Sequence, residues 1–363
     1  MQPSISSGDS ATPASRSDRP AAVAVDGDRV FRWDLDKTYL VSHFESLRGL
    51  LAVPFEKGAD KVALPGVAAV IKGLHRNEER RGNRAHVFFL SASPPQIGGA
   101  IREKLAIDEI RYEGITFKDQ VAHLVRGRFD ALREQIGYKL DQLLTSARAI
   151  SPDAVEFLFG DDWESDPFVY SLYADVLARR VTADLVQDVL ARARVHRHYV
   201  QRICSHLELL SAGPIAHRVP WIFVLRQRRA LPVELESLGS RVVWFDNYFE
   251  CALSLYARGL VDVAAVLDVC RASGLDAHAA AKSYSSTSER APAERAHFEP
   301  ARRGLLDAGL MTWTPPGRFR VRVAAWWRER RGGPRLPAPQ VGGVPDYATL
   351  VDRWSHRRRK ERR

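Results

Sequence analysis

The chain has 363 residues, of which 45% are apolar and 27% charged, and its formal net charge is +10. This composition is typical of a globular protein and excludes a fibrous or wholly disordered one. No run approaches the roughly 18 consecutive apolar residues of a membrane-spanning helix. Segment 1–27 is rich in Ser, Ala and Pro and has no apolar core of the kind found in secretion signals, so we expect it to be disordered. The three cysteines have no metal-binding spacing, which favours a reducing compartment over a disulfide framework.

The positive charge is concentrated in two basic runs. Residues 318–335 and 353–363 each contain seven Lys or Arg and one Glu, so the rest of the chain is slightly acidic. The second run follows a Pro/Gly-rich stretch, and we expect this basic tail to move independently of the folded part. Such a tail can keep the protein in solution, or it can attract the chain to anionic lipid or to nucleic acid.

Three short apolar runs, at 30–33, 86–90 and 155–159, each end abruptly in oxygen-bearing side chains. Their length and their content of β-branched and aromatic residues predict strands. Helical patterns lie between and around them, and two more strand-like runs follow. Strands that alternate with helices predict a parallel sheet covered on both faces, with its ligand site at the carboxyl ends of the strands. The helical patterns are at 67–74, 96–105, 128–148 and 248–260, and the later strands at 221–225 and 242–245.

These patterns divide the chain into four parts. Residues 28–262 form the α/β domain, and 263–330 form a small, mainly helical appendage. Residues 331–363 form the Pro/Gly linker and the basic tail, after the disordered segment 1–27 already described. Within the α/β domain, the stretch 168–210 is helical in pattern but carries no catalytic spacing.

Asp34 and Asp36 directly follow the first strand. A turn at that point can aim both carboxylates into one crevice. One carboxylate can then attack phosphorus, while the other protonates the leaving oxygen and later activates a water molecule. Thr38 is expected to help fix this loop.

A phosphoryl group would add negative charge beside these carboxylates, so the site needs positive charge. A divalent cation with oxygen ligands, above all Mg²⁺, meets that need. Lys139 can act as a fixed cation, and Ser91 can donate a hydrogen bond to a phosphate oxygen, whereas we expect Glu164 to face solvent. The candidate metal ligands are the carboxylates that follow the first and third strands: Asp34, Asp36, Asp161, Asp162 and Asp166.

These residues resemble the four motifs of the haloacid dehalogenase superfamily. Residues 34–38 (DLDKT) fit D-x-D-x-T, 88–91 (FFLS) fit the second motif, Lys139 fits the third, and 160–166 (GDDWESD) fit the fourth. The resemblance implies a Rossmann-like parallel sheet with helices on both faces and Mg²⁺ as the cofactor. It also implies that Asp34 forms an aspartyl-phosphate and that Asp36 handles the proton.

A narrower resemblance is carried by residues 90–94 (LSASP), 138–139 (YK) and 160–170 (GDDWESDPFVY). They are similar to the phosphatidate phosphatase domain of the actin-patch protein family, a relative of the lipins, over about residues 30–261. The chain differs from that family at Lys37, where an acid is usual, and at Asp162 and Trp163, where Ser and Gly are usual. The resemblance implies substrate contacts from Thr38, Ser91, Ala92, Ser93 and Lys139.

The motifs together predict a magnesium-dependent phosphomonoesterase acting on phosphatidate or a related phospholipid. The region 39–86 is too short for a large cap, and an open site suits a headgroup at a membrane or the end of a macromolecule. Two alternatives stay open: a phosphatase of nucleic-acid ends or nucleotides, and a non-catalytic phosphatidate-binding module. We expect a cytoplasmic protein that associates peripherally with anionic membranes through its basic tail, with nucleic acid as the less favoured partner.

Overall fold

The computed structural model describes residues 29–41, 61–93, 95–118, 127–228, 235, 237–292, 294–312 and 342–360. The segment 1–27, which the sequence predicts to be disordered, lies outside these residues. So do the basic run 318–335 and the linker up to residue 341.

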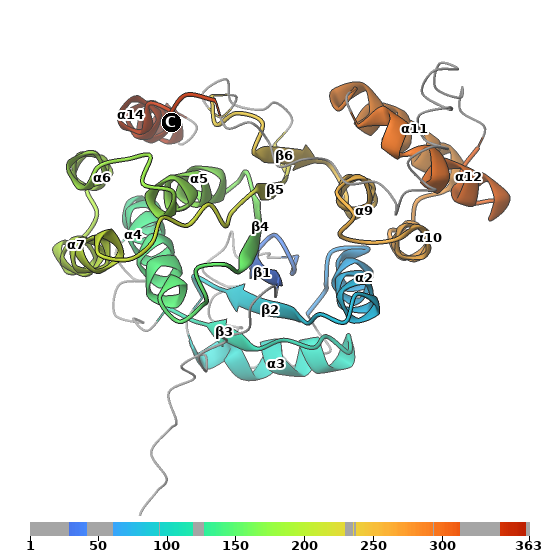
Figure 1. Ribbon diagram of the computed structural model, residues 1–363, viewed down its shortest axis with the longest axis horizontal. Coiled ribbons are helices and arrows are strands. Elements are labelled where there is room, and N and C mark those ends of the chain that lie inside the picture. Colours follow the sequence, from blue (N-terminus) through green and yellow to red (C-terminus); the bar gives the residue numbers. More distant parts are fainter. Residues whose placement is uncertain are drawn as a thin grey trace, which may run out of the picture.

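The centre of the molecule is a parallel sheet in the order β3-β2-β1-β4-β5-β6 (Figure 1). This confirms the predicted α/β class with a parallel sheet. The strand order reverses between β1 and β4, which makes their carboxyl ends the switch point where such sheets bind ligands. The strands are β1 (Arg29–Asp34), β2 (Ala85–Leu90), β3 (Gly114–Thr116), β4 (Val155–Asp161), β5 (Trp221–Leu225) and β6 (Val242–Phe245).

Alternate residues of the central strands build two separate cores, one on each face of the sheet. On the first face, Trp33 stacks on Phe159 at 3.9 Å between ring centroids, and Phe159 stacks on Phe223 at 4.9 Å. On the second face, aliphatic residues such as Leu158 and Ile222 are fully buried. Because both faces are covered, the strands are mostly apolar. The charged residues Arg32 of β1 and Glu156 of β4 are buried and pair with each other at 2.5 Å.

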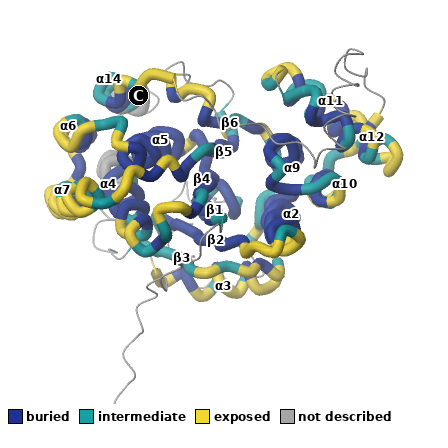
Figure 2. Tube along the Cα trace, viewed as in Figure 1, coloured by how far each residue is buried: buried dark blue, intermediate teal, exposed yellow. Residues whose placement is uncertain are grey.

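Helices cover both faces, as Figure 1 shows, and their inward sides are the buried parts in Figure 2. Two short 3₁₀ turns, Pro95–Ile97 and Arg295–His297, complete the described elements. None of the helices in the described ranges is long and apolar enough to cross a membrane. The first face carries α2 (Val67–Arg80), α3 (Gly98–Ile107), α9 (Tyr248–Ala257), α10 (Val263–Ala272), α11 (Ala277–Arg290) and α12 (Glu299–Asp307). The second face carries α4 (Gly127–Ala147), α5 (Asp166–Leu177), α6 (Ala183–Arg192), α7 (Arg197–Ser211) and α14 (Tyr347–Lys360).

The helices after residue 262 pack directly on the sheet domain. Helix α10 contacts both α2 and α9, and α11 contacts α9. Buried side chains of α10, α11 and α12 belong to the same apolar core as the first face of the sheet. Asp262 and Asp276 cap α10 and α11 through hydrogen bonds of 2.8 Å to backbone amides, which explains why new helices begin there.

Helix α14 is docked through residues 347–354, so the expectation of an independently moving tail is wrong for the start of the tail, while the side chains of the basic residues beyond 354 lie outside the described ones. The Tyr347 side chain is fully buried and its hydroxyl donates to Asp175 Oδ2 of α5 at 2.7 Å. Phe168 of α5 packs edge-on against the rings of Tyr347 and Trp354. The helix docks because Tyr347, Leu350, Val351 and Trp354 form an apolar stripe with helical spacing.

Candidate functional site

The predicted catalytic residues meet at the switch point of the sheet. Asp34 is the last residue of β1 and Asp161 is the last residue of β4, while Ser91 directly follows β2. The amide of Leu35 donates to the Leu90 carbonyl at 3.0 Å, which extends the pairing of β1 and β2 to the point where the chain turns. The strands therefore deliver these side chains to one edge, as the sequence predicts.

Lys139 enters the site from α4. Its side chain is fully buried, and its Nζ lies 2.7 Å from Asp34 Oδ1, 2.9 Å from Glu164 Oε2 and within contact of Asp166 Oδ1. The neighbouring Tyr138 donates to the Thr116 carbonyl of β3 at 3.3 Å, which helps to set the position of α4 against the sheet. One ammonium is thus shared by three carboxylates from two loops.

Glu164 belongs to this cluster, so the expectation that it faces solvent is wrong. Only 8% of its surface is exposed, and its carboxylate bonds the Lys139 ammonium. A signal was present in the sequence, because Glu164 lies between Asp161 and Asp166 in a loop already assigned to the site. What the sequence does not show is that a lysine from another helix reaches the middle of that loop.

The loop after β4 is held by hydrogen bonds within itself. Asp161 Oδ1 accepts from the amides of Trp163 at 2.6 Å and Glu164 at 3.0 Å, and the Asp161 amide donates to Asp166 Oδ2 at 3.3 Å. Gly160 is required here, since a Cβ at that position would lie 2.5 Å from Asp166 Oδ2. The spacing of the G-D-x-x-x-x-D motif therefore places one carboxylate directly against the preceding strand.

Asp36 bonds the loop that follows β2. Its Oδ2 accepts hydrogen bonds from the Ser91 and Ser93 hydroxyls, each at 2.9 Å. The Ser93 amide in turn donates to Ser91 Oγ at 3.1 Å. The two serines thus orient Asp36 in this structure, whereas the sequence predicts that they contact phosphate. Ala92, a half-buried residue, lies between them.

The remaining predicted residues connect loops around the site. Thr38 is buried and its hydroxyl lies 3.5 Å from Asp161 Oδ2, a long contact between the loops after β1 and β4. Asp162 Oδ1 accepts from the Gln227 amide at 2.8 Å and the Arg228 amide at 3.3 Å, which ties the β4 loop to the loop after β5. Asp36 and Asp162 therefore bond other loops, and neither is among the three carboxylates whose oxygens lie within 4.8 Å of one another.

Burial and charge shift the pKa values of this cluster. Burial raises the pKa of Asp34 well above its ordinary range, and the charge of Lys139 opposes that rise. Burial raises the pKa of Asp161 well above its usual value and that of Asp166 to about 6. Burial alone would lower the pKa of Lys139, but the surrounding carboxylates raise it well above the ordinary value, so the ammonium stays charged. Asp36 also has a raised pKa, chiefly because it is buried.

The inner carboxylates fit a divalent cation. Asp34, Asp161 and Asp166 each offer an oxygen, and these oxygens lie within 4.8 Å of one another. Asp34 Oδ2 is buried and has no hydrogen-bond partner among the described residues, which leaves that oxygen available. All-oxygen carboxylate sets suit Mg²⁺ better than softer metals. The excess of buried negative charge gives such an ion an electrostatic reason to bind.

The chain was compared with protein-family models, with curated proteins and with solved structures, and none of the three comparisons gave a match.

Proposed function

We propose that the chain is a magnesium-dependent phosphomonoesterase that works through an aspartyl-phosphate on Asp34. The observation that supports this most directly is that Asp34 contacts a buried lysine and lies close to two further carboxylates, Asp161 and Asp166. Its Oδ1 is held by Lys139 while Oδ2 has no hydrogen-bond partner among the described residues. A carboxylate fixed through one oxygen presents the other as a nucleophile.

In the proposed first step, the Asp34 carboxylate attacks phosphorus. A new bond forms between phosphorus and the aspartate oxygen, the bond to the alcohol breaks, and the alcohol oxygen takes a proton from Asp36. In the second step a water molecule attacks phosphorus and gives a proton to Asp36, while the bond between phosphorus and the Asp34 oxygen breaks, which releases phosphate and restores both side chains. The raised pKa of Asp36 and its anchoring by Ser91 and Ser93 suit a group that must hold and return a proton.

Lys139 keeps Asp34 oriented and offsets part of the negative charge around it. Asp34, Asp161 and Asp166 are the residues that would hold Mg²⁺. When bound, the ion would neutralise carboxylate charge and polarise the phosphoryl group.

The resemblance to phosphatidate phosphatases makes a phospholipid phosphomonoester the proposed substrate. A non-catalytic lipid-binding module is less favoured, because binding alone does not require Asp36 to be held beside a nucleophile on the same loop. The nucleotide alternative remains, and the choice between substrates is made by assay. We propose a cytoplasmic enzyme that meets its substrate at a membrane surface.

The test is a phosphate-release screen with Mg²⁺ across phosphatidate vesicles, nucleotides and 5′- or 3′-phosphorylated oligonucleotides. Wild type, Asp34→Asn and a surface control, Lys72→Gln, would be compared. Lys72 lies on α2 and pairs with Glu109 on the outside of the molecule. We expect release by wild type and control, none in EDTA, and none by Asp34→Asn, since an amide cannot form the aspartyl-phosphate. Near-wild-type turnover by Asp34→Asn would exclude the covalent mechanism.

A further inference from the structure

Two positions where the chain departs from the family it resembles lie together in space. Lys37 follows Asp36 directly, and Trp163 follows Asp162 directly, yet they are far apart in sequence. The Lys37 ammonium lies over the Trp163 ring at 4.5 Å from its centroid, and the Arg228 guanidinium lies 5.4 Å from the same centroid. We call these three residues the cationic rim. Loops after three different strands supply it.

The cationic rim lies next to the proposed chemistry. Consecutive Cα atoms are about 3.8 Å apart, so the backbone of Lys37 adjoins that of Asp36. Lys37 has a left-handed φ of 61°, and Gln227 donates a side-chain hydrogen bond to its carbonyl. The loop conformation is therefore held from the β5 side while the Lys37 side chain reaches Trp163. Trp163 keeps 36% of its surface exposed, so the rim is open to ligands.

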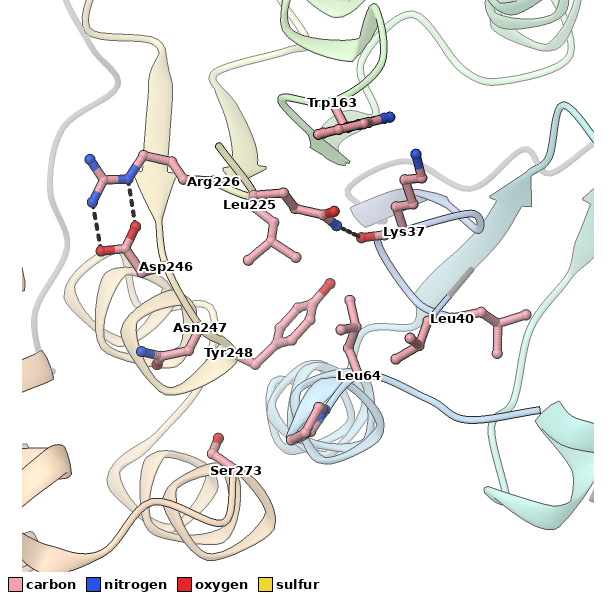
Figure 3. A pocket seen from close by; sticks show the side chains of 13 residues that line it. Lys37, Leu40, Leu64, Trp163, Leu225, Arg226, Asp246, Asn247, Tyr248 and Ser273 are labelled. Carbon is pink, nitrogen blue, oxygen red and sulfur yellow. Dashed lines mark hydrogen bonds and ion pairs between the residues drawn. The ribbon is translucent and has the colours of Figure 1, made fainter. Parts of the chain in front are cut away.

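A pocket of about 410 Å³ opens beside the cationic rim, and Lys37 and Trp163 line it (Figure 3). Figure 3 also shows Arg226 bound to Asp246, by two contacts of 2.5 and 2.6 Å, so the charge of this arginine is already matched. Of the two rim cations, Lys37 lines the pocket. Arg228 contributes to the rim through the Trp163 ring and also acts electrostatically on the Asp162 carboxylate.

We propose that the cationic rim binds a second anionic group, one that the substrate carries on the alcohol side of the phosphomonoester. This inference rests on the proposed function and narrows its substrate class. Phosphatidate leaves a neutral alcohol, whereas a headgroup phosphomonoester of an anionic phospholipid leaves an alcohol that still bears a phosphodiester. Two cations next to the acid–base loop favour the second kind of leaving group. An acid at position 37 would repel it.

The test compares matched substrates that differ in that second charge. The soluble pair is 3-phosphoglycerate, which has a carboxylate, and glycerol 3-phosphate, which has a hydroxymethyl group. The lipid pair is phosphatidylinositol monophosphate and phosphatidate, each in phosphatidylcholine vesicles whose surface charge is equalised with phosphatidylserine. The two pairs distinguish a free anionic substrate from a lipid headgroup. Wild type is compared with Lys37→Gln, Lys37→Glu and Arg228→Gln, and with Lys72→Gln as the surface control.

We expect wild type to prefer the anionic member of a pair by roughly tenfold in kcat/KM, chiefly through KM. Lys37→Gln and Arg228→Gln should each lower that ratio about three- to tenfold, and Lys37→Glu should reverse it. Raising the salt concentration should reduce the wild-type ratio, because partly exposed charges are screened. The control should keep the wild-type ratio.

If the ratio of kcat/KM values for the two members of a substrate pair is the same in wild type and the rim variants, the proposal is wrong. An equal loss of kcat/KM on both members of a pair would also overturn it. The latter result would show that the cationic rim only holds the loops together. Equilibrium binding of the soluble pair to Asp34→Asn provides a measurement independent of turnover. If Asp34→Asn binds 3-phosphoglycerate more tightly than glycerol 3-phosphate, and adding Lys37→Gln to that variant removes the difference, the rim proposal stands even where no phosphate is released. Equal binding of both ligands would refute it.

Discussion

Replacing Lys139 with methionine tests whether one buried ammonium stabilises the whole carboxylate cluster. Methionine keeps most of the apolar stem but leaves Asp34, Glu164 and Asp166 without their shared counter-charge. A single charge pair at 2.7 Å corresponds to about 6 kcal/mol at an effective dielectric constant of 20. Measured losses after removal of one partner of a buried pair are about 3–5 kcal/mol. The expected loss is smaller than the Coulomb figure because the variant no longer buries an ammonium, and because proton uptake by the carboxyl groups relieves part of their mutual repulsion.

That relief makes the loss depend on pH. Burial already raises the pKa of Asp34 and Asp161 well above the ordinary range and that of Asp166 to about 6. Without Lys139 these values should rise further. A carboxyl whose pKa is higher in the folded than in the unfolded state costs no stability below about pH 4, where both states are protonated. The cost grows as pH rises and is complete above the folded pKa. We therefore expect a loss of about 3–5 kcal/mol at pH 7.5 and a smaller loss at pH 5.5.

The assay is urea unfolding followed by circular dichroism at both pH values, in EDTA so that a bound cation does not replace the missing charge. Lys72→Met is the control, because its exposed pair with Glu109 should contribute at most about 1 kcal/mol at either pH. Stability of Lys139→Met within about 0.5 kcal/mol of wild type at pH 7.5 would refute the reasoning, since a surface substitution has effects of that size. An equal loss at both pH values would show that packing, and not charge, accounts for it.

Three further variants test other parts of the molecule. Asp36→Asn should lower kcat about 10²–10⁴-fold on an alkyl ester but leave a burst with p-nitrophenyl phosphate, and stopped-flow kinetics without a burst would contradict its acid–base role. Asp161→Ala should raise the Mg²⁺ concentration needed for half-maximal activity, and an unchanged titration curve would remove it from the metal set. Deleting residues 345–363 should lower the melting temperature and the activity on soluble and vesicle substrates alike, because α14 is packed on α5 and α6. Loss on vesicle substrates alone would instead indicate a tail that acts only at membranes.

The positions of Asp34 and Asp161 could be predicted because strand ends are visible in the sequence. Buried parallel strands appear as short, mostly apolar runs, and the cluster of polar residues that follows each run marks the carboxyl edge of the sheet. Strand β3 could not be found in the same way, since it has only three residues and one of them is glycine. Pairing with Phe88, Phe89 and Leu90 of β2 makes Gly114–Thr116 a strand, because so short a segment is not fixed by its local propensity.

Contacts between distant segments account for what the sequence did not reveal. The resemblance predicts that Ser93 contacts substrate, but its hydroxyl bonds Asp36 in this structure because β1 and β2 are neighbours. The apolar stripe of helix α14 is visible in the sequence, but the many basic residues beside it equally fit an exposed tail. Docking depends on Asp175 being placed to accept from Tyr347, which only the folded chain shows.

The charge of the carboxylate cluster around Lys139 bears on the role of the cationic rim. If all groups are ionised, the described inner cluster holds three formal negative charges in excess, from four carboxylates and one ammonium: Asp34, Asp161, Glu164, Asp166 and Lys139. A bound divalent cation would reduce this excess to one negative charge. A bound phosphomonoester dianion would then raise it to three again. Any further anionic group on the substrate must therefore be attracted by cations outside the cluster, and Lys37 and Arg228 lie on the loops that border it. Lys37→Glu changes the charge of the cationic rim by two units without altering a carboxylate of the cluster around Lys139. The substrate preference of this variant therefore reports directly on the rim.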